Sequence, residues 1–246
     1  MKKKMIFAVV AAMVCANVRA QQHVGTWSIQ PRMGMNVSTI SNAIDASYKV
    51  GIVGGVEADY QVNKWLGVSL GAEYSQQGYK TNALTWLVVN FKRNYGNSPI
   101  YEDIIDRWHW LKTDGKKCHL EYINFPFMAN VYIIKGLALK AGIQFGILTK
   151  ADYPSEVFGE ENSKINIQSF LNAVDISVPL GISYEYANFV LDARYHFGLP
   201  KVKTDDFMKD ASTEDRHIYY IVTNVNEKSC LRNSYLSVTL GYKFHL

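Results

Sequence analysis

Alternation of apolar residues with polar or small ones leaves this chain few possible folds. In residues 137–147, every second side chain from Leu137 to Ile147 is apolar, whereas Lys140 and Gln144 fall on the opposite side. A period of two is the repeat of a β-strand with one apolar face. The pattern recurs in eight segments, at residues 27–35, 50–60, 66–75, 120–134, 137–147, 175–185, 189–198 and 236–244. The sequence therefore predicts an all-β protein.

The links between these segments are alternately short and long. The short links, 62–64, 135–136 and 187–188, each contain Asn or Gly and are typical of tight hairpins. The other links span about 37–47, 76–118, 149–170 and 199–232. In an up-and-down sheet this order puts every long loop at one end, as in outer-membrane barrels. We therefore expect an eight-stranded antiparallel up-and-down transmembrane β-barrel with long extracellular loops.

A water-soluble barrel would show the same alternation, but the placement of charges and aromatic rings favours a membrane barrel. The polar face carries charges in the middle of strands, which an apolar ligand pocket would not accommodate. The apolar face has aromatic residues toward strand ends, among them Trp27, Tyr60, Tyr184 and Phe244. Such rings prefer the boundary between membrane and water. No segment after the N-terminal signal has 18 consecutive apolar residues, so we expect no membrane-spanning helix.

The first twenty residues have the organisation of a secretory signal peptide. Three lysines at positions 2–4 precede an apolar run at 5–14, which is too short to span a membrane. Val18 and Ala20 fit the small-residue rule, which predicts cleavage between Ala20 and Gln21. The chain then divides into a signal peptide, 1–20, and a barrel domain, 21–246, exported to the outer membrane of a Gram-negative cell.

The net charge of +4 belongs to this signal rather than to the barrel. The chain has 26 basic and 22 acidic residues, and loss of the four basic residues of the signal leaves 22 of each. A neutral body lacks the basic footprint of a nucleic-acid-binding protein. The expected surroundings are outer-membrane lipid, with no nucleic-acid partner.

Several stretches resemble the PorT-type outer-membrane β-barrel family, which is typical of Bacteroidota. They are YINFPFMANVYI at 122–133, FVLDARYHFGLPKV at 189–202, the segment 175–185 and the ending GYKF at 241–244. The resemblance implies an outer-membrane barrel. Most members of that family have no assigned activity, and the namesake assists a dedicated protein-secretion system. Members often have an acidic residue two before the proline of the fourth strand and a basic one four after it; here Asn124 and Asn130 occupy these positions.

The interior of so narrow a barrel is expected to be filled by side chains rather than open. The charges of the polar faces are then predicted to pair as a plug, because an unpaired charge there would be costly. A proton or ion route is the alternative. The predicted lumen network comprises Arg32, Glu57, Asp59, Glu73, Lys140, Asp175, Glu185, Asp192, Arg194 and Lys243.

Two cysteines remain after the signal peptide. Cys118 and Cys230 each come just before a predicted strand, at the foot of a long loop. The oxidising envelope permits a disulfide between them. Two free thiols are the alternative, because both loops would have to bring the sulfur atoms within reach.

The loop at 76–118 contains a segment with helical periodicity. Ser98 followed by Pro99 is a helix start signal, and the next residues predict a short amphipathic helix at about 99–111. Its apolar face comprises Ile100, Ile104, Ile105, Trp108 and Leu111. This helix either caps the barrel mouth or presents a docking face for a protein partner or lipid.

Neither a catalytic site nor a cofactor or metal is expected. The six histidines lack metal-ligand spacing, and neither a Gly-x-Ser-x-Gly motif nor a phosphate-binding loop occurs. His196 falls on the polar side of its strand beside Arg194, and we interpret it as a hydrogen-bonded plug residue.

The sequence thus favours a non-catalytic outer-membrane barrel whose extracellular loops bind a partner or serve the structure of the envelope. An accessory role in protein secretion or assembly, as for the family namesake, is the alternative. A lipid-modifying enzyme is a weaker alternative. The sequence predicts no particular oligomeric state.

Overall fold

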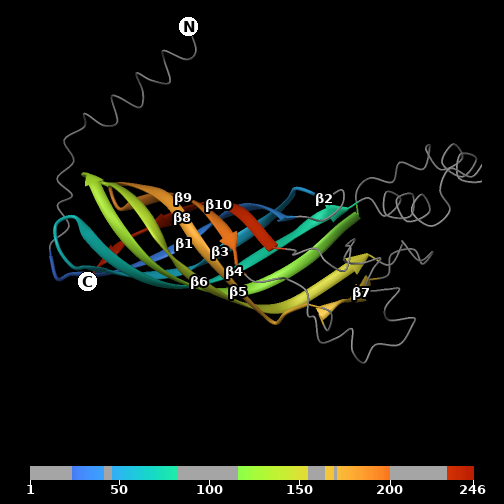
Figure 1. Cartoon of the computed structure of the whole chain (residues 1–246). Helices are drawn as coiled ribbons and strands as arrows, with labels where there is room; N and C mark the ends of the chain where they lie inside the picture. The colour runs from blue at the N-terminus through green and yellow to red at the C-terminus, as the bar shows by residue number, and fades with distance from the viewer. Residues whose placement is uncertain (1–23, 42–45, 82–115, 155–163, 169–170, 200–231) are drawn as a thin grey trace, which may run out of the picture.

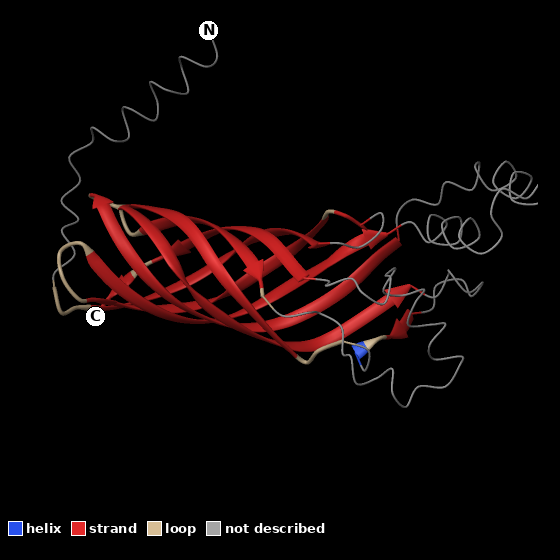
Figure 2. Cartoon of the chain, in the orientation of Figure 1, coloured by secondary structure: helices blue, strands red, loops and turns tan. Residues whose placement is uncertain are grey.

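The computed structural model describes residues 24–41, 46–81, 116–154, 164–168, 171–199 and 232–246, which form a closed antiparallel β-barrel (Figure 1). Strands run along nearly the whole of the described chain (Figure 2). The eight long strands are β1 (Trp27–Ser41), β3 (Lys49–Gln61), β4 (Leu66–Thr81), β5 (Lys116–Ile134), β6 (Leu137–Pro154), β8 (Val174–Tyr186), β9 (Phe189–Gly198) and β10 (Arg232–Tyr242). The short strands are β2 (Ala46–Ser47), β7 (Lys164–Asn166) and β11 (Phe244–His245).

Each long strand pairs with its neighbour along the chain, and the barrel closes between the first and the last. The pairing order is β1, β3, β4, β5, β6, β8, β9 and β10. β10 then pairs with β1 over ten positions, from Arg32 opposite Gly241 to Ser41 opposite Arg232. β11 continues this seam by pairing with the start of β1. The predicted eight-stranded up-and-down barrel is confirmed.

Tight turns join the strands at one end of the barrel, as the short links predicted. Gly136, between β5 and β6, has a φ of +79°, a conformation that glycine adopts without strain. Ala187 and Asn188, between β8 and β9, have φ values of +47° and +70°. Two successive residues with positive φ match the twist of the flanking strands in a two-residue hairpin. In the turn between β3 and β4, the Asn63 side chain accepts hydrogen bonds from the backbone N–H groups of Trp65 and Leu66.

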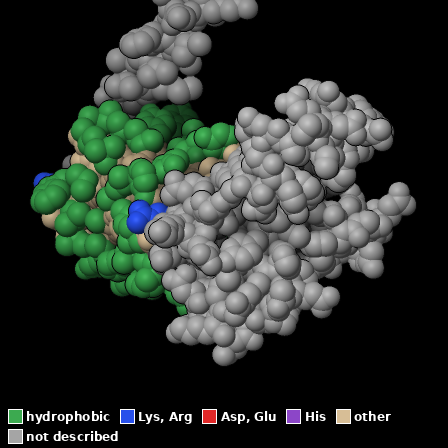
Figure 3. All heavy atoms as spheres, turned by 45° about the vertical axis from the view of Figure 1, so that its right-hand side comes forward, with side chains coloured by type: hydrophobic (Ala, Val, Ile, Leu, Met, Phe, Trp, Pro, Cys, Tyr) green, Lys and Arg blue, Asp and Glu red, His purple; other side chains and the backbone are tan. Residues whose placement is uncertain are grey.

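The two faces of the strands divide as predicted, with polar residues inside and apolar residues outside. In β1, Gln30, Arg32 and Asn36 are buried, whereas Met33 and Met35 are 74% and 58% exposed. In Figure 3 apolar side chains cover the visible wall, and the basic side chains in view lie at its margin. A soluble protein does not leave so continuous an apolar surface in water, but hydrocarbon solvates it. Among the described residues, no helix is long and apolar enough to cross a membrane.

Five strands extend four or more residues further toward the long connections than the alternation predicted. β1 continues to Ser41, β4 to Thr81 and β6 to Pro154, whereas β5 begins at Lys116 and β10 at Arg232. In the extension of β5 the alternation persists with reversed polarity. Cys118, Leu120 and Tyr122 of β5 are buried, and Lys117 on the outer side is exposed. Water replaces lipid around this part of the wall, so its outer face becomes polar and its inner face apolar.

The extensions enclose a small apolar core at the outward end of the interior. Leu171 and Ile167 follow β7 and are 8% and 1% exposed, and the Ile167 N–H donates to the backbone oxygen of Ala151 at 2.9 Å. Other buried apolar side chains in or beside the extensions are Ile40, Tyr79, Cys118, Leu120, Leu148 and Ala151. The polar interior lies between this apolar layer and the turns.

Candidate functional site: the charged interior

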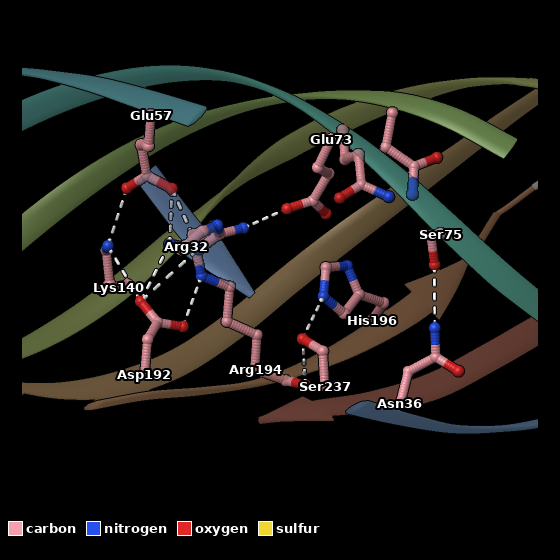
Figure 4. A network of polar contacts seen from close by, with 12 residues as sticks. Arg32, Asn36, Glu57, Glu73, Ser75, Lys140, Asp192, Arg194, His196 and Ser237 are labelled. Atoms are coloured by element: carbon pink, nitrogen blue, oxygen red, sulfur yellow. Dashed lines mark hydrogen bonds and ion pairs between the residues drawn. The ribbon is translucent and has the colours of Figure 1, made fainter. Parts of the chain in front are cut away.

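Six charged side chains from five strands meet in the middle of the barrel. Arg32 comes from β1, Glu57 from β3, Glu73 from β4 and Lys140 from β6, and Asp192 and Arg194 come from β9. Inward-facing positions on opposite sides of the barrel bring them together (Figure 4). Their side chains are between 0% and 4% exposed in the ion pairs they form.

Glu57 lies at the centre of this cluster, in contact with all three cations. Its carboxylate accepts hydrogen bonds from Arg194 Nη2 at 2.7 Å and from Lys140 Nζ at 2.8 Å. Arg32 Nη1 lies 3.1 Å from Glu57 Oε2. A carboxylate surrounded by three cations is retained in its ionised form, because each cation offsets part of the cost of removing the charge from water.

Asp192 provides a second bridge between the same cations. Arg194 Nε donates to Asp192 Oδ1 at 2.7 Å, and Lys140 Nζ donates to Asp192 Oδ2 at 3.0 Å. Arg32 also pairs with Glu73 on the far side of the cluster. Three cations and three carboxylates therefore balance, and the middle of the barrel carries no net charge.

A separate ion pair lies nearer the tight turns. Lys243 Nζ donates to Glu185 Oε2 at 3.0 Å, and His245 Nε2 lies 3.9 Å from Glu185 Oε1. Lys243 follows β10, and Glu185 belongs to β8, so this pair joins strands that are not neighbours in the sheet. It closes the turn end of the interior with a second balanced contact.

The two asparagines that depart from the resembled family pattern have separate partners. Asn130 Nδ2 donates to Asp59 Oδ1 at 3.2 Å and to Ser69 Oγ at 3.3 Å. Asn124 Nδ2 donates to the Tyr235 hydroxyl at 3.3 Å. An ion pair between these two positions therefore has no counterpart in this chain, because neutral amides take part in two different networks.

Neutral polar side chains fill the interior between the charged cluster and the apolar layer. Gln144 Nε2 donates to the Tyr235 hydroxyl at 2.7 Å, and Asn36 Nδ2 donates to Ser75 Oγ at 2.9 Å. The His196 ring stacks on the Tyr235 ring with centroids 4.0 Å apart, and its Nε2 lies 3.2 Å from Ser237 Oγ. These partners, which sequence reasoning did not identify, lie on the inward face that the alternation predicts.

All ten residues of the predicted lumen network are buried in the interior, but they do not form one cluster. Six of them make the central cluster, and Glu185 and Lys243 form the pair near the turns. Asp59 is hydrogen-bonded by Asn130, and Asp175 is buried with Asn233 as a hydrogen-bond partner. The geometry fits a plug of paired charges, and the role of that plug in blocking ions stays a prediction.

The remaining predicted sites are only partly described. Among the described residues Cys118 has no disulfide partner; it is fully buried within β5 rather than in a loop, and Cys230 lies outside that part of the chain. The predicted disulfide therefore stays a prediction. The signal-peptide cleavage site at Ala20 and Gln21 also lies outside the described residues, as does the predicted helix with Ile100, Ile104, Ile105, Trp108 and Leu111.

The described side chains form a structural interior, and no catalytic arrangement is evident among them. In these ranges no three His, Cys, Asp or Glu side chains are grouped so that they could hold a metal ion. His196 stacks on Tyr235 and its Nε2 lies 3.2 Å from Ser237 Oγ, but among the described residues no carboxylate is hydrogen-bonded to its Nδ1. Hydrogen bonds and ion pairs join many of the polar side chains along the length of the interior.

Comparison with known proteins gives one family and several barrels of low sequence identity. A family model described as outer membrane protein beta-barrel domain matches residues 19–203. Neisserial surface protein A is 16% identical over 89% of this chain and 97% of its own, with a TM-score of 0.46. Ail of Yersinia pestis, in complex with the heparin analogue sucrose octasulfate, is 13% identical over 90% of this chain and 100% of its own, with a TM-score of 0.43. OprG of Pseudomonas aeruginosa is 12% identical over 92% and 99%, with a TM-score of 0.42. No curated protein matches the chain.

Proposed function

Because the chain belongs to the outer membrane protein beta-barrel domain family, we propose that it is a non-catalytic envelope barrel that acts through its outward-facing connections. The family places it in the outer membrane. The barrel is the anchor, and the long segments that join its outward strand ends bind a partner or contribute to the structure of the envelope.

The packing of the interior is the observation that supports this proposal. Arg194 is fully buried, and it joins Glu57 and Asp192 across the middle of the barrel. Eight strands enclose a space just wide enough for side chains to fill, and here ion-paired side chains fill it. A substrate would have no route past this cluster without breaking several buried ion pairs, so function is left to the ends of the barrel.

Among the partners such connections could bind, components of a protein-secretion or assembly system are the second candidate. The stretches at 122–133 and 189–202, which resemble PorT-type barrels, favour it. Residues 122–133 lie in β5 and residues 189–198 form β9, however, and resemblance of a barrel wall does not transfer a role that depends on the connections.

Crosslinking in intact outer membranes tests the proposal. The full-length chain is compared with a variant lacking residues 84–110 and with a matched variant lacking residues 203–228, which shortens a different connection. The first deletion is expected to abolish capture of a specific partner while the barrel still inserts. Retention of the same partner by both deletion variants would contradict a role for the connections. Specific capture of secretion-channel subunits by the full-length chain would select the second candidate.

A further inference from the structure

Two lysines on the outer wall of the barrel lie directly across from one another. Lys80 on β4 pairs in register with Lys117 on β5. Their neighbours Tyr79 and Cys118 are buried, so the alternation puts both lysine side chains on the outer face. Like charges directly opposite on one face of a sheet destabilise it, and no ion pair or hydrogen bond of either ammonium group is found among the described residues.

These lysines lie beyond the apolar belt, on the side of the long connections. On the outer face of β5 the belt ends at Ile123, which is 41% exposed, and Lys117 follows six positions further. At about 3.3 Å per residue and a strand tilt of about 40°, Lys117 stands about 15 Å above that boundary. Lys150 on β6 comes three positions after Ile147 and therefore lies nearer the bilayer surface.

Lys150 is already engaged, which distinguishes it from the other two. Its Nζ lies 3.0 Å from Asp152 Oδ2, and its side chain is 52% exposed. Glu121, two positions beyond Ile123, adds a negative charge at the same level. The anion-binding potential is therefore concentrated at Lys80 and Lys117, above the depth at which ordinary phospholipid headgroups end.

We propose that Lys80 and Lys117 together bind the phosphate groups of an outer-leaflet glycolipid whose phosphorylated sugar head projects above the bilayer. A phosphate between the two ammonium groups would replace their mutual repulsion with two charge-assisted contacts. The height of the pair favours phosphates on a projecting sugar head over phosphates at the bilayer surface. The inference depends on the proposed function only for the direction in which the long connections face.

The experiment measures binding of rough lipopolysaccharide with a phosphorylated core to the full mature chain in zwitterionic micelles. The variants are K80A/K117A, the charge-preserving K80R/K117R, and K64A/K135A, whose lysines lie in exposed turns at the other end of the barrel. Each is first shown to be folded by its shift in mobility on heating. Because each lysine near an anionic membrane surface strengthens binding about fivefold, K80A/K117A should bind about 25-fold more weakly.

K80R/K117R and K64A/K135A are expected to bind as the parent chain does. Removal of the phosphates from the lipopolysaccharide should weaken its binding to the parent chain. The loss should be as large as the loss that K80A/K117A shows with the intact lipopolysaccharide. Equal binding of lipopolysaccharide by the parent and K80A/K117A would overturn the proposal. So would a loss of binding in K64A/K135A as large as that in K80A/K117A, or binding of phosphatidylglycerol vesicles by the parent chain as tight as its binding of lipopolysaccharide. The readout is direct lipid binding, so its failure leaves the crosslinking result for the connections unaffected.

Discussion

Glu57 is the residue on which the interior charges most depend. Its carboxylate contacts Arg32, Lys140 and Arg194, and its side chain is 1% exposed. Any change that removes its charge leaves three cations facing one another, with Asp192 and Glu73 to balance them. Removing one partner of a buried ion pair is far more costly than the pair itself is stabilising.

Glu57→Gln is therefore expected to destabilise the folded barrel by about 3–5 kcal/mol, because it leaves buried positive charge uncompensated. The measurement is the free energy of unfolding in urea, with the protein in lipid vesicles. Glu121→Gln, at the outer margin of the wall, is the matched control and should change stability by less than about 0.5 kcal/mol. Equal effects of the two substitutions would show that Glu57 is not the centre of the network.

Gly78 is a second residue whose identity the backbone requires. Its φ is +125°, and a Cβ atom there would lie 2.1 Å from the backbone oxygen of Cys118. Gly78→Ala should cost about 3 kcal/mol, combining backbone strain with displacement of the neighbouring strand. Gly25→Ala, at φ +85° with nothing within 4 Å of the added carbon, isolates the strain and should cost about 1 kcal/mol. Urea unfolding of both variants checks this, and a smaller loss for Gly78 than for Gly25 would be inconsistent with the close approach.

The inward positions of the charged residues could be predicted from the sequence, but not their partners. Alternation alone puts Glu57 and Arg194 on the polar face. Their contact joins residues 137 positions apart in the chain. It depends on the stagger between strands around the closed barrel, which a one-dimensional pattern does not contain. Asn124 and Asn130 were noted as departures from a resembled family, and their hydrogen bonds to Tyr235 and Asp59 could not be anticipated.

At the scale of the strands, the change of polarity along β5 is the most informative feature. Its outer face exposes apolar side chains at Ile123, Phe125 and Phe127. Lys117 lies on the same face, nearer the long connections. The extension from Lys116 to residue 119 was not predicted, because alternation with one polar and one apolar face ends where the polarity of the two faces reverses.

This reversal predicts two environments on one face of β5. With Cys118 and Cys230 replaced by alanine, spin labels are attached at position 123 or at position 117 in vesicle-reconstituted protein. The label at 123 should collide mainly with oxygen, which concentrates in hydrocarbon, and the label at 117 mainly with a water-soluble nickel complex. The measurement is the ratio of the two accessibilities by power saturation. The same ratio at both positions would mean that the boundary does not lie between them.

The turns were the elements most accessible to prediction. Residues 135–136 and 187–188 were predicted as two-residue hairpins, and the positive φ values of Gly136, Ala187 and Asn188 are consistent with that prediction. The strand ends beside the long connections were harder to predict from the sequence. β2 pairs with β4 through only two residues, and β7 pairs with β6 through only three. Such short pairings are set by neighbouring strands rather than by a pattern of their own.

At the scale of the whole molecule, the barrel combines an apolar exterior with an interior of balanced charge. The seam between β1 and β10 leaves the long strands without a free edge, as a hydrocarbon environment requires. Along its axis the interior passes from the Glu185–Lys243 pair through the central cluster to the apolar core of the extensions. Each of these three layers opposes the passage of ions, and we therefore infer that the barrel is closed and acts at its ends.

Planar-bilayer recording of the purified monomer tests this closure most directly. An open outer-membrane barrel reconstituted in the same way serves as the control for insertion. We expect no steady conductance above that of the bare membrane, because an ion would have to break the contacts of Glu57 with Arg32, Lys140 and Arg194. Steady, unitary conductance from monomeric protein would contradict a closed barrel, and would show that the interior charges line a path for ions.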